Sequence, residues 1–434
     1  MNELLNLIKS KKAKVGVVGL GYVGLPLAVE ASKAGFTVMG FDVQNEKVNN
    51  VNAGKNYIGD IVGSELAIVV KDGKLSATTD YAKIKDCDVI IICVPTPLDK
   101  YMQPDITYIV NSTNEIAKNR KKKTLIVLES TTYPGTTEEV LKPILEKDGS
   151  KVGVDFFLAF SPERVDPGNE KFKTQNTPKV VGGCTKNCNE LAKEFYGLVL
   201  SGGVHTVSSP SVAEMEKLLE NIFRLVNIGL VNELALLCDK MKVDIWEVVD
   251  AAKTKPYGFM PFYPGPGLGG HCIPIDPFYL TWKAKEYNFH TRIIDVAGQI
   301  NQSMPNYVVN KVGKILNEHS KCYANSNIVL LGVAYKRDID DYRESPVIQI
   351  YESLVGLGAK VSVIDPHVPE FRSDHTGNKY KTVQFSNDLL RNADIVVLTT
   401  DHKTFDRTAI MENSKLIFDT RNFMGQKSSK IYSL

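Results

Sequence analysis

The sequence lacks an excess of charge of either sign, because 52 Lys and Arg residues face 50 Asp and Glu residues and leave a net charge of +2. Proteins that bind nucleic acid or acidic membrane surfaces usually carry a basic field, so neither partner is expected from this composition. Local sites for anions remain compatible with the balance.

Cysteine is also scarce: the chain has seven, spread over 434 residues, and none of them forms a C-x-x-C pair. An odd number at wide spacing disfavours both a disulfide framework and a zinc site. Cys184 and Cys188 lie four residues apart, but no His stands at metal-ligand spacing from them, so we interpret them as structural. No metal site is predicted.

Long apolar runs are missing as well. The N-terminus begins Met-Asn-Glu without the apolar core of a signal peptide, and no run reaches about 18 apolar residues. Secretion and membrane spanning are therefore unexpected, and a reducing cytoplasm is the predicted location. The length of 434 residues, of which 43% are hydrophobic, predicts two or three domains.

Glycine and proline, in contrast, are concentrated in residues 264–277, where they fill 8 of 14 positions around a single cysteine, Cys272. Gly267, Gly269 and Gly270 permit positive φ and let main-chain N–H groups approach a bound molecule, while the prolines stiffen the flanks. The Cys272 side chain is therefore expected to be accessible from the loop rather than packed in a core.

The residues after Cys272 favour a reactive thiolate. Pro274 and Asp276 indicate a helix that begins near Ile275, which places the thiol at the positive end of the helix dipole. Asp276 follows one turn later, within reach of the same site. The alternative is a plain surface loop with an inert cysteine, since most free cysteines are unreactive.

A glycine fingerprint stands near the N-terminus. Gly19-x-Gly21-x-x-Gly24 follows a predicted buried strand at 14–19 and opens an apolar-periodic helix, and Asp42 ends the next strand, 18 residues beyond the last glycine. This context predicts a dinucleotide site, with the pyrophosphate at the helix N-terminus and the acid on a ribose hydroxyl.

Asp42 also bears on the choice of dinucleotide. A 2′-phosphate would meet its carboxylate, so NAD is favoured over NADP. The alternative for the whole fingerprint is a tight strand-to-helix turn without a ligand.

Three further predicted strands end in small polar, proline or charged residues, as at the carboxyl edge of a doubly wound sheet, where ligands bind. These strands and the residues that follow them are 88–94 with Pro95 and Thr96, 125–128 with Thr131, and 156–160 with Glu163 and Arg164. A surface ion pair is the alternative for Glu163 and Arg164. The strands at 179–183 and 204–207 complete the unit.

A long helix is predicted from Ser209 to about Met241. Pro210 lies in its first turn, and Ser211 with Glu214 matches a Ser-x-x-Glu capping box. At 1.5 Å per residue the helix spans roughly 45 Å, too long to be buried by one small domain. We interpret it as the connector between the halves of the chain and as the seat of a subunit interface.

Lys217 and Asn221 lie four residues apart on this helix and share one face. Both are polar within an apolar pattern. Simple solvent exposure is the alternative interpretation, since lysines are rarely buried.

The remaining pattern predicts further helices and then a second parallel α/β unit. The helices lie at 244–253, 278–288 and 296–317; the strands at 328–334, 361–365, 395–399 and 416–418; and the alternating helices at 347–356 and 387–393.

The first turn of this unit has no glycine fingerprint, and Lys336, Arg337 and Arg343 stand in its place. Basic side chains there suit a diphosphate. The alternative is a solvated charge cluster that Asp338 and its acidic neighbours neutralise.

Several motifs in this order resemble the UDP-glucose/GDP-mannose dehydrogenase family, over about residues 14–421. The motifs are Gly19-Leu-Gly-Tyr-Val-Gly24-Leu-Pro, Val94-Pro-Thr-Pro97, Ser161-Pro-Glu-Arg164, the Lys217/Asn221 helix, Gly269-Gly-His-Cys272-Ile-Pro-Ile-Asp276-Pro and Ala334-Tyr-Lys-Arg-Asp.

The resemblance implies an α/β chain in which two Rossmann-like parallel-sheet domains are joined by a central helical module with one long helix. It places an NAD-binding domain at 1–208, a dimerisation module with the catalytic cysteine at 209–318, and a UDP-sugar domain at 319–434. The implied reaction takes the C6 hydroxymethyl of a nucleotide sugar to a carboxylate with two NAD⁺ and without release of the aldehyde. A homodimer through the central helix is the expected assembly.

The resemblance also assigns roles to residues. Cys272 is the expected nucleophile; Lys217 and Asn221 bind the oxyanion; Asp276 moves a proton through water; Glu163 and Thr131 steer the hydrolytic water. The expected cofactor residues are Gly19, Gly21, Tyr22, Val23, Gly24, Asp42, Pro95, Thr96 and Thr131. The expected substrate residues are Glu163, Arg164, Lys217, Asn221, Tyr263, Gly269, Lys336, Arg343 and Arg421.

Two local features bear on the sugar. The UDP-glucose branch tends to carry an arginine ahead of the cysteine loop, where this chain has Lys255-Pro-Tyr, and a small residue where this chain has His271. The loop resembles the branch that acts on UDP-N-acetylhexosamines. We therefore expect UDP-N-acetylglucosamine, with UDP-N-acetylmannosamine and then UDP-glucose as alternatives, and a non-catalytic nucleotide-sugar or NAD sensor as the alternative of another class.

Overall fold

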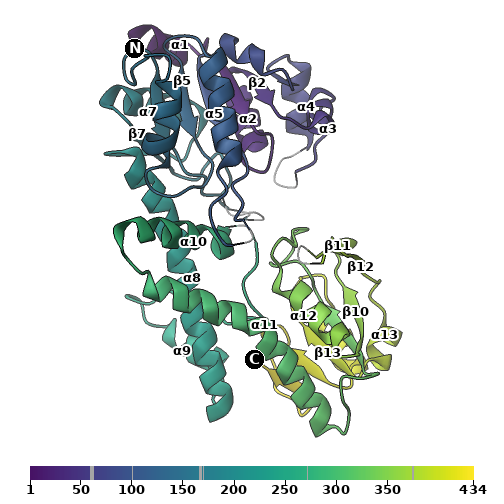
Figure 1. Cartoon of the computed structure of the whole chain (residues 1–434). Helices are drawn as coiled ribbons and strands as arrows, with labels where there is room; N and C mark the ends of the chain where they lie inside the picture. Colours follow the sequence, from purple (N-terminus) through teal and green to yellow (C-terminus); the bar gives the residue numbers. More distant parts are fainter. Residues whose placement is uncertain (59–62, 100, 166–168, 170, 271, 374–375) are drawn as a thin grey trace. The chain divides into compact units, whose positions relative to one another are not determined.

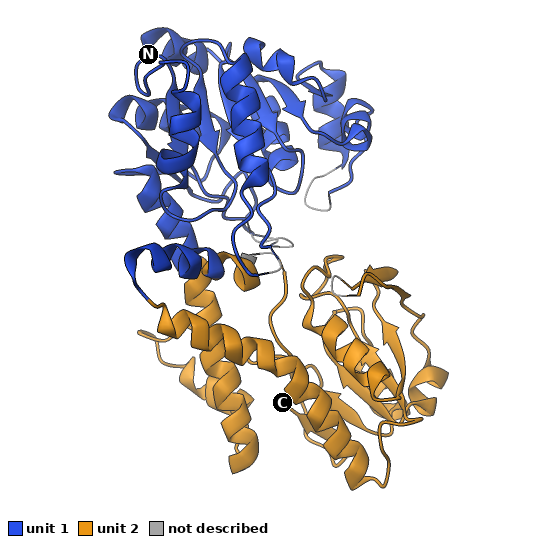
Figure 2. Cartoon of the chain, in the orientation of Figure 1, with its two compact units in different colours: residues 1–220, 278–289 blue, residues 221–277, 290–434 orange. Residues whose placement is uncertain are grey.

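The structure is a computed structural model of the whole chain (Figure 1); it describes all residues except 59–62, 100, 166–168, 170, 271 and 374–375, and only the backbone of Cys272. The chain forms two compact units, shown in Figure 2. Unit 1 comprises 1–220 and 278–289, and unit 2 comprises 221–277 and 290–434. The division into three domains stays a prediction.

Unit 1 is built on an eight-stranded sheet of order β3-β2-β1-β4-β5-β6-β7-β8. Neighbouring strands run parallel, except that β6 and β7 are antiparallel. The strands are β1 Lys14–Val18, β2 Thr37–Phe41, β3 Leu75–Thr78, β4 Val89–Ile92, β5 Leu125–Leu128, β6 Phe157–Phe160, β7 Lys179–Gly183 and β8 Val204–Val207. The strand order reverses between β1 and β4, which is where a doubly wound sheet binds its ligand.

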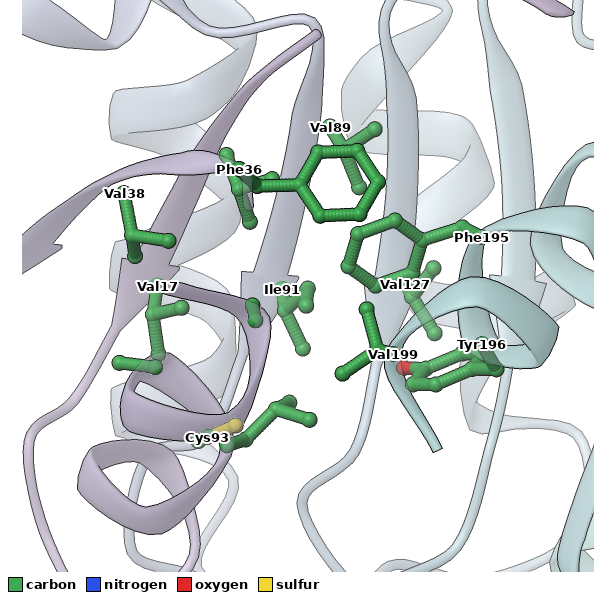
Figure 3. Close-up of a cluster of buried hydrophobic side chains, with 14 of the residues drawn as sticks. Val17, Phe36, Val38, Val89, Ile91, Cys93, Val127, Phe195, Tyr196 and Val199 are labelled. Carbon is green, nitrogen blue, oxygen red and sulfur yellow. The ribbon is translucent and has the colours of Figure 1, made fainter. Parts of the chain in front are cut away.

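Helices cover both faces of this sheet. They are α1 Asn2–Lys9, α2 Gly24–Lys33, α3 Asn45–Asn52, α4 Gly63–Lys71, α5 Thr107–Asn119, α6 Lys142–Leu145 and α7 Lys186–Val199, with shorter turns η1 Tyr81–Asp86 and η2 Thr137–Leu141. Alternate residues of one strand enter different cores, as the pleat requires: Val89 and Ile91 face one, Ile90 and Ile92 the other. Figure 3 shows the first core, where the rings of Phe36 and Phe195 lie 5.5 Å apart.

Unit 2 contains an all-parallel sheet of order β10-β9-β13-β14-β15 and a small antiparallel hairpin. The strands are β9 Asn327–Leu331, β10 Lys360–Ile364, β11 Glu370–Arg372, β12 Lys379–Lys381, β13 Ile395–Leu398, β14 Ile417–Asp419 and β15 Ile431–Ser433. The helices are α9 Ile245–Ala252, α11 Arg292–Glu318, α12 Pro346–Gly356, α13 Asn387–Asn392 and α14 Arg407–Asn413. The fold class expected from the sequence is confirmed.

Helix α8 (Pro210–Met241) is continuous, as predicted, but its start differs in one respect. Glu214 forms no capping box with Ser211. Its carboxylate accepts hydrogen bonds from the N–H of Gly135, at 2.6 Å, and of Thr137, at 2.9 Å, so it caps the turn that begins η2. The Ser-x-x-Glu box was therefore a wrong prediction, because both oxygens of Glu214 are already engaged by Gly135 and Thr137. The helix start is capped instead by Ser209, whose Oγ accepts the N–H of Val212 at 3.3 Å.

Helix α10 (Cys272–Ala284) begins at the cysteine itself, earlier than either the start near Ile275 or the helix at 278–288 that we predicted. Pro274 is compatible with this start because first-turn N–H groups have no partner within the helix. The helix ends in η3 (Lys285–Tyr287), where Asn288 adopts a left-handed φ of 54°.

Candidate active site

The glycine fingerprint forms the turn between β1 and α2. A Cβ on Gly19, whose φ is 93°, would lie 2.4 Å from the carbonyl oxygen of Cys93, and a Cβ on Gly24 would lie 1.9 Å from the oxygen of Gly19. Gly21 has no atom within 4 Å of that position. Two glycines thus allow the tight turn and the third leaves open space, so the loop fits a dinucleotide pyrophosphate.

Asp42 directly follows β2 and is buried. Its Oδ2 accepts the N–H of Leu20 at 2.9 Å, and its Oδ1 accepts the N–H of Gln44 at 2.9 Å. The Nζ of Lys47 lies 3.5 Å from Oδ2. The carboxylate is therefore fixed beside the glycine loop, at the position where a ribose is bound in this fold.

The other predicted cofactor residues lie in the same unit. Tyr22 and Val23 belong to the glycine loop, and the Tyr22 side chain is exposed. Pro95 and Thr96 follow β4 and Thr131 follows β5, at the carboxyl ends of neighbouring strands. Their assignment to the cofactor stays a prediction.

Glu163 and Arg164 do not form the surface ion pair considered above. Arg164 pairs with Glu220 on α8, through Nε at 3.1 Å and through Nη2. Glu163 instead pairs with the Nζ of Lys179 at 3.3 Å, and its other oxygen accepts the N–H of Val165 at 2.9 Å. The two side chains therefore serve different networks. A cavity of about 290 Å³ lies beside Arg164, lined also by Asn169, Phe172, Thr177, Pro178 and Glu220.

Lys217 is buried, which argues against simple solvent exposure. Burial raises the pKa of Glu163, but the charges of Lys179 and Lys217 and the N–H of Val165 outweigh it, so the pKa lies below its ordinary value. Unit 1 thus holds an ionised carboxylate that two buried lysines stabilise.

In unit 2, Asp276 lies one turn after Cys272 on α10, and its side chain is buried. The Nδ2 of Asn221, on α8, donates a hydrogen bond to Oδ2 of Asp276 at 2.6 Å. The predicted carboxylate and the predicted oxyanion-binding amide are therefore partners. Lys217 stands one helical turn before Asn221 along α8.

The loop before Cys272 is anchored at its start by buried amides that the sequence did not reveal. The N–H of Gly265 donates to Oδ1 of Asn232 on α8 at 3.0 Å, and Nδ2 of Asn232 donates to Oδ1 of Asn301 on α11 at 2.9 Å. Both asparagines are buried. An asparagine on the buried side of an apolar helix is the only sequence signal of such a contact.

The glycines nearer Cys272 make close backbone contacts within unit 2. Gly267 and Gly270 adopt positive φ, as expected, but Gly269 does not. A Cβ on Gly269 would lie 2.5 Å from the Cβ of Tyr335, so here glycine provides space rather than conformational freedom. The N–H of Gly270 donates to the carbonyl oxygen of Arg343 at 2.9 Å. The loop is thereby fixed to the segment that carries the predicted diphosphate residues.

The predicted substrate residues Lys336, Arg343 and Arg421 follow β9 and β14 of the second sheet. Arg343 pairs with Asp341 at 2.6 Å. Burial lowers the pKa of Arg421 to about 10; Asp419 opposes the shift, and the charge of Arg337 adds to it. An anionic ligand would relieve this shortage of counter-charge.

Tyr263 is tied to helix α9. Its ring stacks on Trp246, with centroids 5.8 Å apart, and its hydroxyl lies 3.1 Å from Oδ1 of Asp250. These contacts account for the position of Tyr263. None of them tests its expected role in substrate binding, which stays a prediction.

A His-rich cluster stands in the same unit: ligand atoms of Asp338, His367 and His402 lie within 4.8 Å of one another. The Nδ1 of His402 already accepts the backbone N–H of Asp338 at 3.0 Å, and its Nε2 lies 3.1 Å from Asp365. Since both nitrogens of this buried ring are engaged, the cluster is explained as a hydrogen-bond network that holds the turn after β9.

Three models of one protein family match successive segments of the chain. The NAD binding domain of the UDP-glucose/GDP-mannose dehydrogenase family matches residues 13–199, its central domain 211–303, and its UDP binding domain 329–426. Two curated relatives, both UDP-N-acetyl-D-glucosamine 6-dehydrogenases, are 39% identical in Pseudomonas aeruginosa (82% of this chain, 84% of the relative) and 34% identical in Salmonella typhi (91% of each).

A solved structure is similar over nearly the whole length. The UDP-D-ManNAc dehydrogenase of Pyrococcus horikoshii superposes with a TM-score of 0.88 at 32% identity, covering 97% of this chain and 98% of that one. The chain therefore belongs to the UDP-glucose/GDP-mannose dehydrogenase family, and it is an NAD-dependent nucleotide-sugar dehydrogenase.

Proposed function

We propose that this protein oxidises C6 of UDP-N-acetylglucosamine to the carboxylate, with Cys272 as the covalent nucleophile. The observation that carries the proposal is the arrangement at the start of α10: Cys272 is its first residue, and Asp276, one turn later, is bonded to Asn221. A thiolate is favoured at a helix N-terminus, and the buried carboxylate with its amide partner provides a fixed proton acceptor.

The proposed chemistry distributes roles among the residues. Bound NAD⁺ would accept the two electrons of each of two oxidations. The Cys272 thiolate attacks the C6 aldehyde to give a thiohemiacetal, and the second oxidation leaves a thioester. Lys217 and Asn221 stabilise the oxyanion, and Asp276 exchanges its proton through water. Glu163 and Thr131 direct the water that releases the acid.

The choice of sugar rests on relatives and on the loop. Two of the relatives described above are named for UDP-N-acetyl-D-glucosamine, and the similar solved structure for UDP-D-ManNAc. His271, which contributed to the expectation of an acetamido sugar, lies outside the described residues. UDP-N-acetylmannosamine is the close alternative, because the two sugars differ only in configuration at C2.

Steady-state rates on UDP-N-acetylglucosamine, UDP-N-acetylmannosamine, UDP-glucose and GDP-mannose test the proposal. We expect the highest kcat/KM for the first and two NADH per acid formed. An acetamido pocket left with unpaired polar groups should disfavour plain glucose by about 1–3 kcal/mol. A preference for UDP-glucose or GDP-mannose would contradict the choice of sugar, and one NADH per product would contradict the double oxidation.

Cys272→Ala should abolish net turnover and leave NAD⁺ binding close to that of the wild type, because the glycine loop and Asp42 are unchanged. Cys322→Ala is the matched control, since Cys322 is an exposed free cysteine in unit 2. Wild-type turnover by Cys272→Ala would refute the covalent mechanism. Binding of NAD⁺ and nucleotide sugar by the wild type without formation of NADH would favour the sensor.

We further propose a homodimer that packs through α8. Leu230, Leu234, Leu237 and Met241 are exposed and recur at spacings of three and four, so they form one apolar stripe along the helix. By length and hydropathy α8 could also cross a membrane: an 18-residue window has a mean hydropathy of 1.4, and 33% of it is buried. We favour the dimer because buried Asn232 links this helix to α11 and the loop, and we expect a cytoplasmic protein.

A further inference from the structure

Lys179 is a buried lysine that has no role in the mechanism proposed above. It is the first residue of β7, and its side chain is only 6% exposed. Its Nζ lies 3.1 Å from Oε2 of Glu129 and 3.3 Å from Oε2 of Glu163. Removing charged groups from water costs free energy, and pairing them offsets this cost only in part. A buried lysine held between two carboxylates therefore raises the question of its function.

Glu129 is the fully buried member of the two carboxylates that pair with Lys179. It directly follows β5, its side chain is fully buried, and its Oε1 accepts a hydrogen bond from the hydroxyl of Tyr196 on α7. The ring of Tyr196 also lies 5.4 Å from the Nζ of Lys179. Glu129 and Tyr196 therefore fix the ammonium group from the side of the sheet core.

Glu163 is the partly exposed member of the two carboxylates. Its side chain is 17% exposed, the most accessible of the three charged groups. One of its oxygens accepts the N–H groups of Arg164 and Val165 at 3.0 and 2.9 Å, and the other faces Lys179. Both oxygens are thus held in place, and the side chain keeps partial access to solvent, which a base that activates water needs.

The two carboxylates differ in their affinity for protons. Burial raises the pKa of Glu129 above its ordinary value, although Lys179 opposes the shift. The pKa of Glu163 lies below its ordinary value, since Lys179, the N–H of Val165 and Lys217 outweigh its burial. On acidification the pair therefore takes up a proton at Glu129 first and leaves Glu163 ionised.

We propose that Lys179 is a positioning residue that keeps the Glu163 carboxylate ionised and oriented as the base for hydrolysis of the Cys272 thioester, with Glu129 and Tyr196 as its anchor. This inference rests on the proposed function. In the step that it serves, water forms a C–O bond to the acyl carbon, the C–S bond breaks, and the electron pair of that bond leaves on the Cys272 sulfur. The water proton goes to Glu163, and the product is the free acid.

The test follows the acyl-enzyme in the full-length protein. Wild type and variants are mixed with NAD⁺ and the nucleotide sugar that the wild type oxidises fastest, quenched in acid and analysed by mass spectrometry for an acyl group on Cys272. In Lys179→Met we expect NADH to form in a burst, the adduct to accumulate, and hydrolysis to slow by about 10²-fold or more, in the range of lost general-base catalysis. Lys179→Arg should restore most of the rate and the wild-type pH profile.

The Lys179→Met variant leaves two buried carboxylates without their shared cation, so a loss of activity in it has to be distinguished from a failure to fold. The double variant Lys179→Met/Glu129→Gln keeps the net charge of the cluster, because one cation and one anion are removed together. A purely structural role for Lys179 predicts wild-type hydrolysis in this variant. Our proposal predicts that the adduct still accumulates and that the acid limb of the hydrolysis rate moves to higher pH.

Lys311→Met is the matched control, since Lys311 is similarly buried and pairs with Asp239 at 2.6 Å, outside the proposed catalytic groups. It should show no adduct beyond the wild-type level. Hydrolysis at the wild-type rate in a folded double variant would overturn the inference about Lys179 alone. Wild-type turnover by Cys272→Ala would overturn the proposed covalent function, and this inference with it.

Discussion

Nδ2 of Asn221 and Oδ2 of Asp276 lie 2.6 Å apart, in a hydrogen bond that links helix α8 to helix α10 one turn after its start. Both side chains are buried. A carboxylate withdrawn from water and held by an amide has a fixed orientation, and Cys272 stands one turn before it on the same helix. The bond therefore sets the direction in which Asp276 presents its other oxygen.

Asp276→Asn should lower kcat by roughly 10²- to 10⁴-fold, the usual worth of a general acid or base, with little change in KM. The new amide can still accept the bond from Asn221, so the unfolding transition should stay near that of the wild type. Asp388→Asn, at an exposed acid on α13, serves as the control and should retain wild-type kcat. A fall in kcat of less than threefold for Asp276→Asn would exclude the proton-transfer role.

Asp42→Asn should raise kcat/KM for NADP⁺ relative to NAD⁺ by roughly 10- to 100-fold, because like charges in a binding site cost several kcal/mol. Asparagine keeps an acceptor for the N–H of Leu20, so the glycine loop should remain ordered. The Nζ of Lys47, 3.5 Å from the carboxylate, would then be available to a phosphate. Adding Lys47→Met should cancel part of the gain; an unchanged preference in Asp42→Asn would show that another group selects NAD⁺.

Both sheets could be predicted from the sequence because their buried parallel strands appear as short apolar runs between helices. Strand β3 was missed, since Leu75–Thr78 is short and half polar. The antiparallel pairing of β6 and β7 was missed because strand direction depends on the path of the chain between them. The local residue pattern therefore reveals neither a short, half-polar strand nor the direction in which a strand runs.

The predicted site residues were found from glycine spacing, strand ends and family motifs, all of which are local in sequence. The partners of those residues are not local. Glu129 and Lys179 are 50 residues apart, and Gly265 and Asn232 are 33 apart. A charged residue at the start of an apolar strand, such as Lys179, was the available signal, but its partner could be identified only from the folded structure.

Glu214 should make the protein less stable as the pH rises. Burial raises the pKa of its carboxyl group to about 7, although three donors from Gly135 and Thr137 oppose the shift. Because the folded-state pKa is the higher one, its contribution is present below the ordinary value of 4.5 and is lost as the pH passes 7.

The loss between pH 5 and 8 is roughly 2–3 kcal/mol in the free energy of unfolding, from a shift of this size at 1.36 kcal/mol per pKa unit. Urea unfolding of the wild type and Glu214→Gln at both pH values measures it. Glutamine does not titrate, so the stability gap between the two proteins should narrow toward pH 8. Glu190→Gln, at an exposed residue of α7, should show no such change, and a gap that is constant with pH would contradict the assignment to Glu214.

The apolar stripe of α8 is the surface through which we expect the dimer to form. Leu230 and Leu234 are exposed one turn apart on this helix, and a second copy of the chain would remove them from water. A two-fold interface contains both copies of each residue, so the double variant brings four introduced carboxylates into it. Leu230→Glu together with Leu234→Glu should therefore convert a dimer to a monomer through like-charge repulsion and unpaired burial.

Light scattering during size-exclusion chromatography measures the change, in detergent-free buffer and after removal of membranes by ultracentrifugation. Ile68→Glu is the control, because Ile68 is as exposed and apolar but lies on α4. We expect a dimer for the wild type and the control and a monomer for the double variant. A dimer that survives both charges would place the interface elsewhere, whereas a wild-type protein that sediments with membranes and needs detergent would favour the membrane interpretation of α8.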